Sequence, residues 1–311
     1  MKPKILFMGT PEFAVPSLDL LLKRDYPVIG AVTQPDRPKG RGKPLTPPPV
    51  KLFAEAHGVP VLQPERVRTA EFLEHFGRLA PDLVAVAAFG QILPKEMLER
   101  PRLGCVNVHP SLLPRYRGAA PLNWTIMRGE TATGVTIMQM DEGMDSGDIL
   151  LQEETPVGPG ETVGELHDRL AVRGAQLLLD VIGMLEKGAI RPMPQDHAAA
   201  TFAPRLRKED GLIRWDADAP SIVRLIRGLS PSPCAYTFLD GKMLRIFNAL
   251  ESEEAPEALP GTLSFSETEL LVRAGSGSVS LLDVQLEGKK RMPVRDFMRG
   301  FRLKPGDRLH F

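Results

Sequence analysis

The chain has 311 residues, and its 39 lysines and arginines balance its 39 aspartates and glutamates. A formal charge of zero argues against a strongly basic domain that would bind any nucleic acid tightly. With 42% hydrophobic and 25% charged residues the composition is globular, and the length predicts about two domains. Because the sequence contains neither a run of about 18 apolar residues nor a signal-peptide core, we expect a cytoplasmic protein that does not contact a membrane. We also expect a monomer.

The first half of the chain alternates short apolar runs with stretches of helical period. Near-continuous apolar strands joined by helices are typical of a parallel sheet covered on both faces. The expected strands are Ile5–Met8, Val28–Thr33, Val59–Leu62, Leu83–Phe89 and Cys105–Val108. The expected helices are Phe13–Lys23, Val50–His57 and Ala70–Leu79. We therefore predict an α/β fold with a Rossmann-like, mostly parallel sheet.

Two further helices and two further strands follow before the alternating pattern ends. A helix at Leu122–Arg128, strands at Gly134–Met140 and Ile149–Glu154, and a long helix at Val163–Glu186 would complete a first domain, residues 1–189. Residues 190–204 are rich in Pro and Ala, with one Gln and one Asp, and show no period, which indicates a linker.

Residues 205–311 have a different pattern. A helix is expected at Ser221–Leu229 and another at Pro293–Phe301. Between them lie short strands separated by glycine turns, namely Tyr236–Leu239, Met243–Leu250, Gly261–Phe265, Leu270–Ala274 and Val279–Leu286. Five short strands in about 100 residues favour a small β-barrel of the OB type as the second domain.

The first turn of the sheet does not favour a dinucleotide cofactor. It has one glycine, Gly9, followed by Thr10 and Pro11, where the dinucleotide fingerprint needs three glycines. Thr10 as the N-cap residue and Pro11 at the first helical position give a purely structural interpretation.

The end of the fifth expected strand combines an amide with an imidazole. Period-2 alternation places Cys105, Asn107 and His109 on one face of the strand. Asn107 can donate two N–H bonds to an oxygen that gains charge, and His109 can accept and return a proton near neutral pH. Since ligands of open α/β sheets bind at the carboxyl ends of strands, the pair predicts a catalytic site. Cys105 is a possible nucleophile, although such cysteines mostly serve packing.

A catalytic histidine usually needs an orienting acid. The loop Asp141–Asp148 offers four acids, and the residues alone do not choose among them, because solvated turns and Asx motifs also use such acids. The two cysteines lack CxxC spacing, and no cluster has the spacing of a zinc site, so we expect no metal.

Two regions concentrate positive charge despite the zero total. The first is a loop that contains Arg37, Lys39, Arg41 and Lys43, interleaved with glycine and proline. The second, Lys289–Arg308, has eight lysines and arginines against two acids, and it begins with Lys289, Lys290 and Arg291. Such surfaces on a loop and an OB-like barrel suit a phosphate backbone.

Several motifs resemble a known family. The segment Asn107–Pro114 with Arg117-Gly118, followed by Met144–Asp148, resembles the signature of folate-dependent formyltransferases. Further segments are similar to the branch of this family that acts on tRNA, namely Gly9–Phe13, Gln34–Pro38, Lys39–Lys43, Pro49–Lys51 and Gly134–Met138. The similarity runs nearly from end to end.

The resemblance implies a reaction, a donor and a partner. The formyl group of 10-formyltetrahydrofolate would pass to the α-amino group of methionine on initiator tRNA. Asn107, His109 and Asp145 would be catalytic, and the folate would contact Ser111, Leu112, Leu113, Pro114, Phe89, Gly90 and Ile92. The basic residues Arg37, Lys39, Arg41, Lys43, Lys289, Lys290 and Arg291 would bind the tRNA.

Three alternatives stay open. A formyltransferase for a sugar-nucleotide or other small amine would share the catalytic residues, but the long Lys39–Lys43 loop argues against it. A 10-formyltetrahydrofolate hydrolase would have no evident use for the basic regions. A non-catalytic RNA-binding protein on the same fold would not need Asn107, His109 and Asp145 together.

Overall fold

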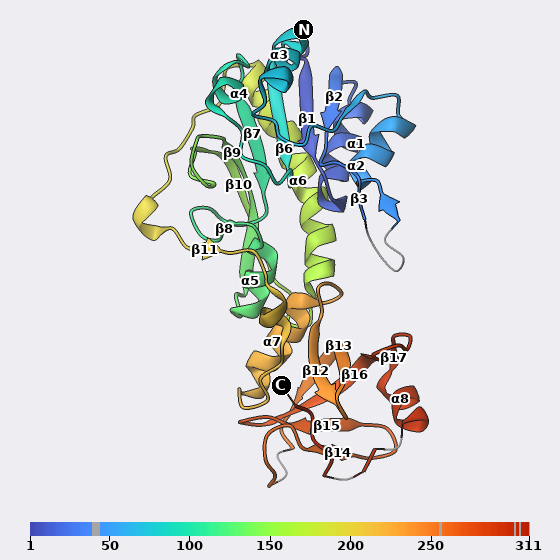
Figure 1. Cartoon of the computed structure of the whole chain (residues 1–311). Helices are drawn as coiled ribbons and strands as arrows, with labels where there is room; N and C mark the ends of the chain where they lie inside the picture. The colour runs from blue at the N-terminus through green and yellow to red at the C-terminus, as the bar shows by residue number, and fades with distance from the viewer. Residues whose placement is uncertain (39–43, 255–256, 302, 305, 311) are drawn as a thin grey trace. The chain divides into compact units, whose positions relative to one another are not determined.

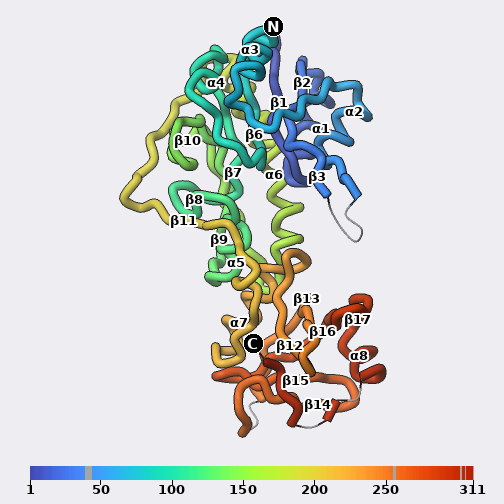
Figure 2. The backbone as a smooth tube through the Cα atoms, in the orientation of Figure 1, coloured from blue at the N-terminus to red at the C-terminus, as the bar shows by residue number. Residues whose placement is uncertain are grey.

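A computed structural model describes residues 1–38, 44–254, 257–301, 303–304 and 306–310 (Figures 1 and 2). By their contacts these residues form two compact units, each assembled from several stretches of chain. Unit 1 contains residues 1–118, 132–156 and 167–203, and unit 2 contains residues 119–131, 157–166 and 204–311. The described residues include no helix long and apolar enough to cross a membrane.

Unit 1 is built on a seven-stranded sheet in the order β10-β9-β7-β6-β1-β2-β5 (Figure 1). Strands β1, β2, β5, β6 and β7 run parallel to one another. β9 is antiparallel to β7, and β10 is antiparallel to β9, so β10 runs in the same direction as the first five. The strands are β1 (Ile5–Gly9), β2 (Val28–Val32), β5 (Val61–Leu62), β6 (Leu83–Ala87), β7 (Cys105–His109), β9 (Ala132–Gln139) and β10 (Ile149–Pro156). The predicted Rossmann-like α/β class is confirmed.

Helices cover this sheet because its strands are apolar on both faces. The helices are α1 (Val15–Lys23), α2 (Pro49–Ala56), α3 (Ala70–Leu79), α4 (Lys95–Glu99) and α6 (Val163–Glu186). Phe76 of α3 and Met97 of α4 share one buried cluster with Met8 and Val86 of the sheet. A Cβ on Gly174 of α6 would lie 2.6 Å from Cγ1 of Val108, so glycine lets this helix approach the sheet closely.

The turn after β1 differs from the sequence interpretation. Thr10 is not an N-cap: a short 3-10 helix, η1 (Glu12–Ala14), starts after Pro11 without a side-chain cap, so this prediction is wrong. The Thr10 hydroxyl instead donates to the carbonyl of Phe89 and accepts from the amide of Gln34, each at 3.3 Å. Because β1 lies between β6 and β2, its first loop residue reaches the loops that follow both neighbours.

Small elements complete unit 1. They are β3 (Arg37–Pro38), β4 (Leu45–Thr46), β8 (Arg117–Gly118), η2 (His197–Ala199) and β11 (Phe202–Ala203). β3 pairs with β4, and β11 pairs with β8 in parallel. Figure 2 shows the chain after α6, in yellow, running beside β8.

Unit 2 contains an antiparallel sheet in the order β12-β13-β16-β15-β14, with β17 paired to β16. Its strands are β12 (Ala235–Leu239), β13 (Lys242–Ser252), β14 (Leu263–Phe265), β15 (Leu270–Arg273), β16 (Ser278–Leu286) and β17 (Met292–Pro293). Bridges from His310 to Phe238 and from Arg308 to Thr262 join the two edges of the sheet. The sheet therefore closes into the small barrel that the strand spacing predicts.

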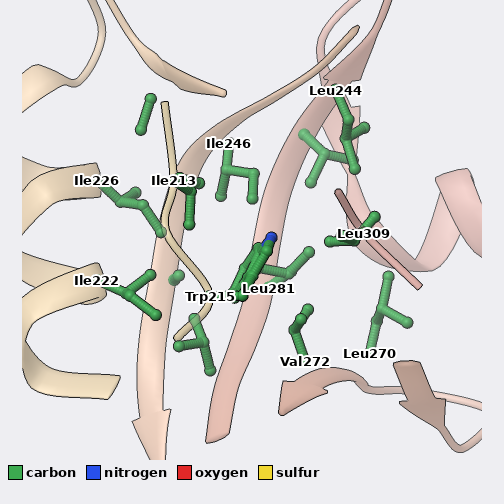
Figure 3. Packing of buried hydrophobic residues seen from close by; sticks show 14 of the residues in the cluster. Ile213, Trp215, Ile222, Ile226, Leu244, Ile246, Leu270, Val272, Leu281 and Leu309 are labelled. Carbon is green, nitrogen blue, oxygen red and sulfur yellow. The ribbon is translucent and has the colours of Figure 1, made fainter. Parts of the chain in front are cut away.

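The barrel surrounds one apolar core. Trp215 is fully buried there among Ile222, Ile246 and Leu281 (Figure 3), and its indole N–H donates to Thr237 Oγ1 at 3.0 Å. The helices of this unit are α5 (Pro121–Met127), η3 (Lys208–Gly211), α7 (Ala219–Leu229) and α8 (Val294–Gly300).

Candidate active site

The candidate site lies at the carboxyl end of β7, in unit 1. His109 is 4% exposed, and its Nε2 lies 3.0 Å from the carbonyl oxygen of Tyr116. A carbonyl oxygen can only accept, so Nε2 carries a proton and Nδ1 is the nitrogen that can gain one. Nδ1 lies 3.7 Å from Oδ2 of Asp145. The structure thus brings two of the three predicted catalytic residues face to face.

The third predicted residue, Asn107, precedes His109 by two positions on the same strand. Its neighbours on β7 are buried, whereas Asn107 itself is only half-buried. Its side-chain amide makes no hydrogen bond to the residues described here, unlike His109 and Asp145. Two N–H donors at the end of a strand are therefore available for an external oxygen.

The Asp145 loop holds its carboxylate in place. Asp145 has φ of +50°, in the left-handed region, and its Oδ2 accepts the amide N–H of Gly118 at 2.8 Å. The Asp141 carboxylate instead accepts from Gly143 and Ser146 within the loop, as an Asx motif does. The fold, rather than composition, distinguishes these two acids.

The predicted folate segment is fixed by a residue that sequence reasoning missed. Thr136 of β9 is fully buried beside His109 in the strand register. Its hydroxyl donates to the carbonyl of Ser111 at 2.6 Å and accepts from the amide of Leu113 at 3.2 Å. The side-chain amide of Gln152 adds a bond to the same hydroxyl at 2.8 Å and another to the Leu113 carbonyl at 3.0 Å. A threonine hydroxyl within a buried, mostly apolar strand was the available signal.

Leu112 and Pro114, the other members of that segment, are half-buried. Glycine at position 134 is required beside Leu112: a Cβ there would lie 2.5 Å from Leu112 Cδ2 and 2.1 Å from the carbonyl oxygen of Glu153. The Leu112 side chain therefore packs directly against the backbone of β9.

The three predicted folate contacts in the loop after β6 differ in their exposure to solvent. Phe89 is 2% exposed and belongs to the apolar cluster under α3 and α4, while its carbonyl accepts from Gln34 Nε2 at 3.1 Å. Gly90 has φ of +84° and is exposed, and Ile92 is 82% exposed. Gly90 and Ile92 are thus open to a ligand, whereas the Phe89 ring serves the core.

Cys105 shares the strand face of Asn107 but is not built as a nucleophile. It is fully buried, and burial raises the pKa of its thiol to about 12. The thiol donates to the carbonyl of Met97 at 3.3 Å. The thiolate that nucleophilic attack requires is therefore strongly disfavoured, and packing is the role of this cysteine.

The basic residues predicted to bind tRNA differ in their surroundings. Arg37 is exposed on β3, whereas Lys39, Arg41 and Lys43 lie outside the described residues. Lys289 and Lys290 are exposed in the turn between β16 and β17. Arg291 is engaged: it forms an ion pair with Asp283, and its guanidinium lies 4.3 Å from the ring centre of Phe247.

The arrangement at the end of β7 has the chemical groups that a reaction at a carbonyl group needs. It provides unpaired amide donors for an oxygen that gains charge, next to an imidazole–carboxylate pair for proton transfer. Among the described residues, no group of three or more His, Cys, Asp or Glu is placed to hold a metal ion.

Residues 1–182 match the family described as Formyl transferase, and residues 205–302 match the family described as Formyl transferase, C-terminal domain. The chain belongs to the formyl transferase family. It is 57% identical to the methionyl-tRNA formyltransferase of Syntrophus aciditrophicus over 306 residues, which covers 98% of both chains. It is 52% identical to the methionyl-tRNA formyltransferase of Citrifermentans bemidjiense, over 97% of this chain and 95% of that one.

A solved structure agrees at the level of the fold. The methionyl-tRNA formyltransferase from Clostridium thermocellum superposes with a TM-score of 0.58 at 18% identity, covering 92% of this chain and 99% of that chain.

Proposed function

We propose that this protein transfers the formyl group of 10-formyltetrahydrofolate to the α-amino group of methionine on initiator tRNA, for the start of translation. The observation that carries the proposal is the unpaired amide of Asn107 beside the His109–Asp145 pair, in a member of the formyl transferase family. The full-length similarity to proteins named methionyl-tRNA formyltransferase supports this choice of acceptor.

The reaction forms one bond, breaks another, and moves one proton from the acceptor amine to the donor nitrogen. The acceptor amine attacks the formyl carbon, and the bond from that carbon to the donor nitrogen breaks. The amine loses a proton and the donor nitrogen gains one. Asn107 donates N–H bonds to the formyl oxygen while that oxygen gains charge. His109 takes up the amine proton at Nδ1, where the Asp145 carboxylate stabilises the resulting imidazolium, and then returns a proton to the donor nitrogen as it leaves.

The formyl donor would lie along the segment Ser111–Pro114, which Thr136 holds rigidly at the end of β7. Gly90 and Ile92 add open backbone and exposed apolar surface in the neighbouring loop, where Phe89 anchors the chain. These residues fit a flat ring system with polar edges, because they combine apolar side chains with backbone groups.

The acceptor would be held by positive charge. Arg37 with Lys39, Arg41 and Lys43 would contact the tRNA near the site, and Lys289, Lys290 and Arg291 would contact its phosphates from the barrel. Residues 1–189 would thus act as the catalytic domain, 190–204 as the connection and 205–311 as the tRNA-binding domain. We place this reaction in the cytoplasm, carried out by a monomer without a metal ion.

The decisive experiment offers one donor to several acceptors. The purified chain and 10-formyltetrahydrofolate are incubated with charged initiator methionyl-tRNA, with the same tRNA uncharged, with an amino-sugar nucleotide, and with buffer alone. We expect formyl transfer to the charged tRNA only. Preferred transfer to the amino sugar, or release of formate without an acceptor, would favour the small-amine transferase or the hydrolase instead.

A further inference from the structure

We propose that Gln195 is a positioning residue for Asp145, and that the segment 190–203 belongs to the catalytic apparatus. This inference rests on the proposed function. The segment reads as a linker in the sequence, yet its hydrogen bonds lie within unit 1, at the candidate site.

Gln195 is 6% exposed and uses its full hydrogen-bonding capacity. Its Oε1 accepts from Nε and Nη2 of Arg117 at 3.1 and 2.6 Å. Its Nε2 donates to the carbonyl oxygens of Asp145 and Gly147 at 2.9 and 2.7 Å. The side chain thus joins a buried arginine to the backbone of the Asp145 loop.

The chemistry of these partners fixes the orientation of the amide. A guanidinium can only donate, and two backbone carbonyls can only accept, so Oε1 must face Arg117. A glutamate at position 195 would keep the bonds from Arg117 but would set an oxygen against both carbonyls. An alanine would leave a buried guanidinium and two carbonyls without this partner.

Asp145 requires such an anchor. Its φ of +50° is a conformation that residues with a Cβ rarely adopt, so surrounding contacts must maintain it. The carboxylate must at the same time face His109 Nδ1 and accept the Gly118 amide. Gln195 holds the backbone carbonyl of this same residue, which restricts where its side chain can point.

The same segment also supports the other side of His109. Thr201 Oγ1 accepts the amide of Tyr116 at 2.9 Å, and the Thr201 carbonyl accepts the amide of Arg117 at 2.9 Å. Tyr116 is the residue whose carbonyl receives His109 Nε2. The segment 190–203 therefore positions the partners of both imidazole nitrogens. This is the physical reason to assign it to the catalytic apparatus.

Substitution of Gln195 should lower turnover rather than substrate binding. Q195A and Q195E should each reduce kcat by roughly 10- to 100-fold with KM for donor and tRNA nearly unchanged, because misplaced catalytic groups lose rate steeply. The matched control is Q176A: Gln176 makes a surface hydrogen bond to Asp180 on α6 and should show wild-type kinetics.

A double-mutant cycle separates positioning from general structural damage. If Gln195 acts through Asp145, adding Q195A to D145N should cause no further loss of kcat beyond that of D145N. Losses that multiply would mean that Gln195 acts elsewhere, and they would overturn the proposal. Wild-type kcat in Q195A would overturn it equally.

Hydrogen exchange at the Gly118 amide gives a readout independent of turnover. This amide donates to Asp145 Oδ2, so Q195A should exchange it faster than wild type, and Q176A should not. If the intact protein formylates no acceptor, the proposed function fails, and exchange alone then decides this inference. Unchanged protection of Gly118 in Q195A would overturn it.

Discussion

The two ring nitrogens of His109 have different partners, and this difference underlies the role proposed for each residue of the candidate site. Nε2 is held by a carbonyl, Nδ1 faces Asp145, and the nearby amide of Asn107 is uncommitted. We therefore expect H109A and N107A each to lower kcat by about 100-fold or more, with donor binding intact. Steady-state kinetics together with donor titration measures both quantities. Near-normal turnover in either variant would remove that residue from the mechanism.

Two buried threonines allow a matched comparison of how a threonine-to-valine substitution changes the free energy of unfolding. Thr136 Oγ1 has three hydrogen-bond partners, so T136V should cost about 1–3 kcal/mol of unfolding free energy and raise KM for the donor. Thr125 is equally buried, but its hydroxyl has no partner among the described residues. T125V should therefore be neutral or stabilising. Denaturant unfolding compares them, and equal losses would contradict the role assigned to Thr136.

At the scale of elements, Asp36 anchors the chain immediately before β3, the strand that pairs with β4. Hydrogen bonds from Gln63 and from Lys51 hold the pKa of the Asp36 carboxyl below its ordinary value of 3.8. A carboxyl with a lowered folded-state pKa stabilises the fold above the unfolded-state pKa, and this stabilisation is lost as pH falls through the folded-state value.

The D36N variant tests this anchor. Its Tm should be lower than that of wild type at pH 7, and the difference should shrink once pH falls below about 3.8. D19N, which removes only a surface pair with Lys23 on α1, should change Tm at pH 7 by less. Thermal unfolding at several pH values measures the effect, and a difference that grows toward low pH would contradict the assignment.

The basic residues between β16 and β17 lie in two different environments, exposed at Lys289 and Lys290 and paired at Arg291. K289A and K290A should each weaken tRNA binding and lower the salt slope by about 1, without changing Tm. Arg291 is paired with Asp283 and covers Phe247, which is 8% exposed. R291A should therefore lower stability by about 1 kcal/mol and change the salt slope less. Binding isotherms at several salt concentrations, with Tm values, distinguish the two roles.

At the scale of the whole molecule, unit 2 includes chain from the first half of the sequence. Helix α5 packs on α7, where Asn123 Nδ2 donates to the carbonyl of Gly228 at 2.8 Å. A Cβ on Gly228 would lie 2.6 Å from Met127 Cγ, so the two helices are in close contact. Arg227 of α7 also donates to the carbonyl of Pro159.

A fragment of residues 205–311 lacks these partners of α7. Its α7 amides should therefore exchange faster than in the intact chain, whereas the amides of β13 and β16 inside the barrel should exchange similarly. Hydrogen-exchange mass spectrometry compares the two proteins. Equal protection of α7 would show that this helix is stable without α5.

The sequence by itself determined the local structure and predicted the central residues of the candidate site. Helices Ala70–Leu79 and Val163–Glu186 have the bounds that their helical period predicts, because such a signal depends on residues close in the chain. The alternation at Cys105–His109 was equally readable and pointed to Asn107 and His109. The motif resemblance, rather than any spacing, added Asp145.

Only the tertiary structure decided which groups hold these residues. Asp145 depends on Gly118 and on Gln195, which is 50 positions away, and Thr10 bonds to loops that follow other strands instead of capping a helix. Sequence patterns do not reveal such partners, because a hydrogen bond across a sheet is set by which strands lie side by side. The charges show the same division between sequence and fold. The sequence gives their total of zero, whereas the pairing of Arg291 with Asp283 and the exposure of Lys289 and Lys290 depend on the fold.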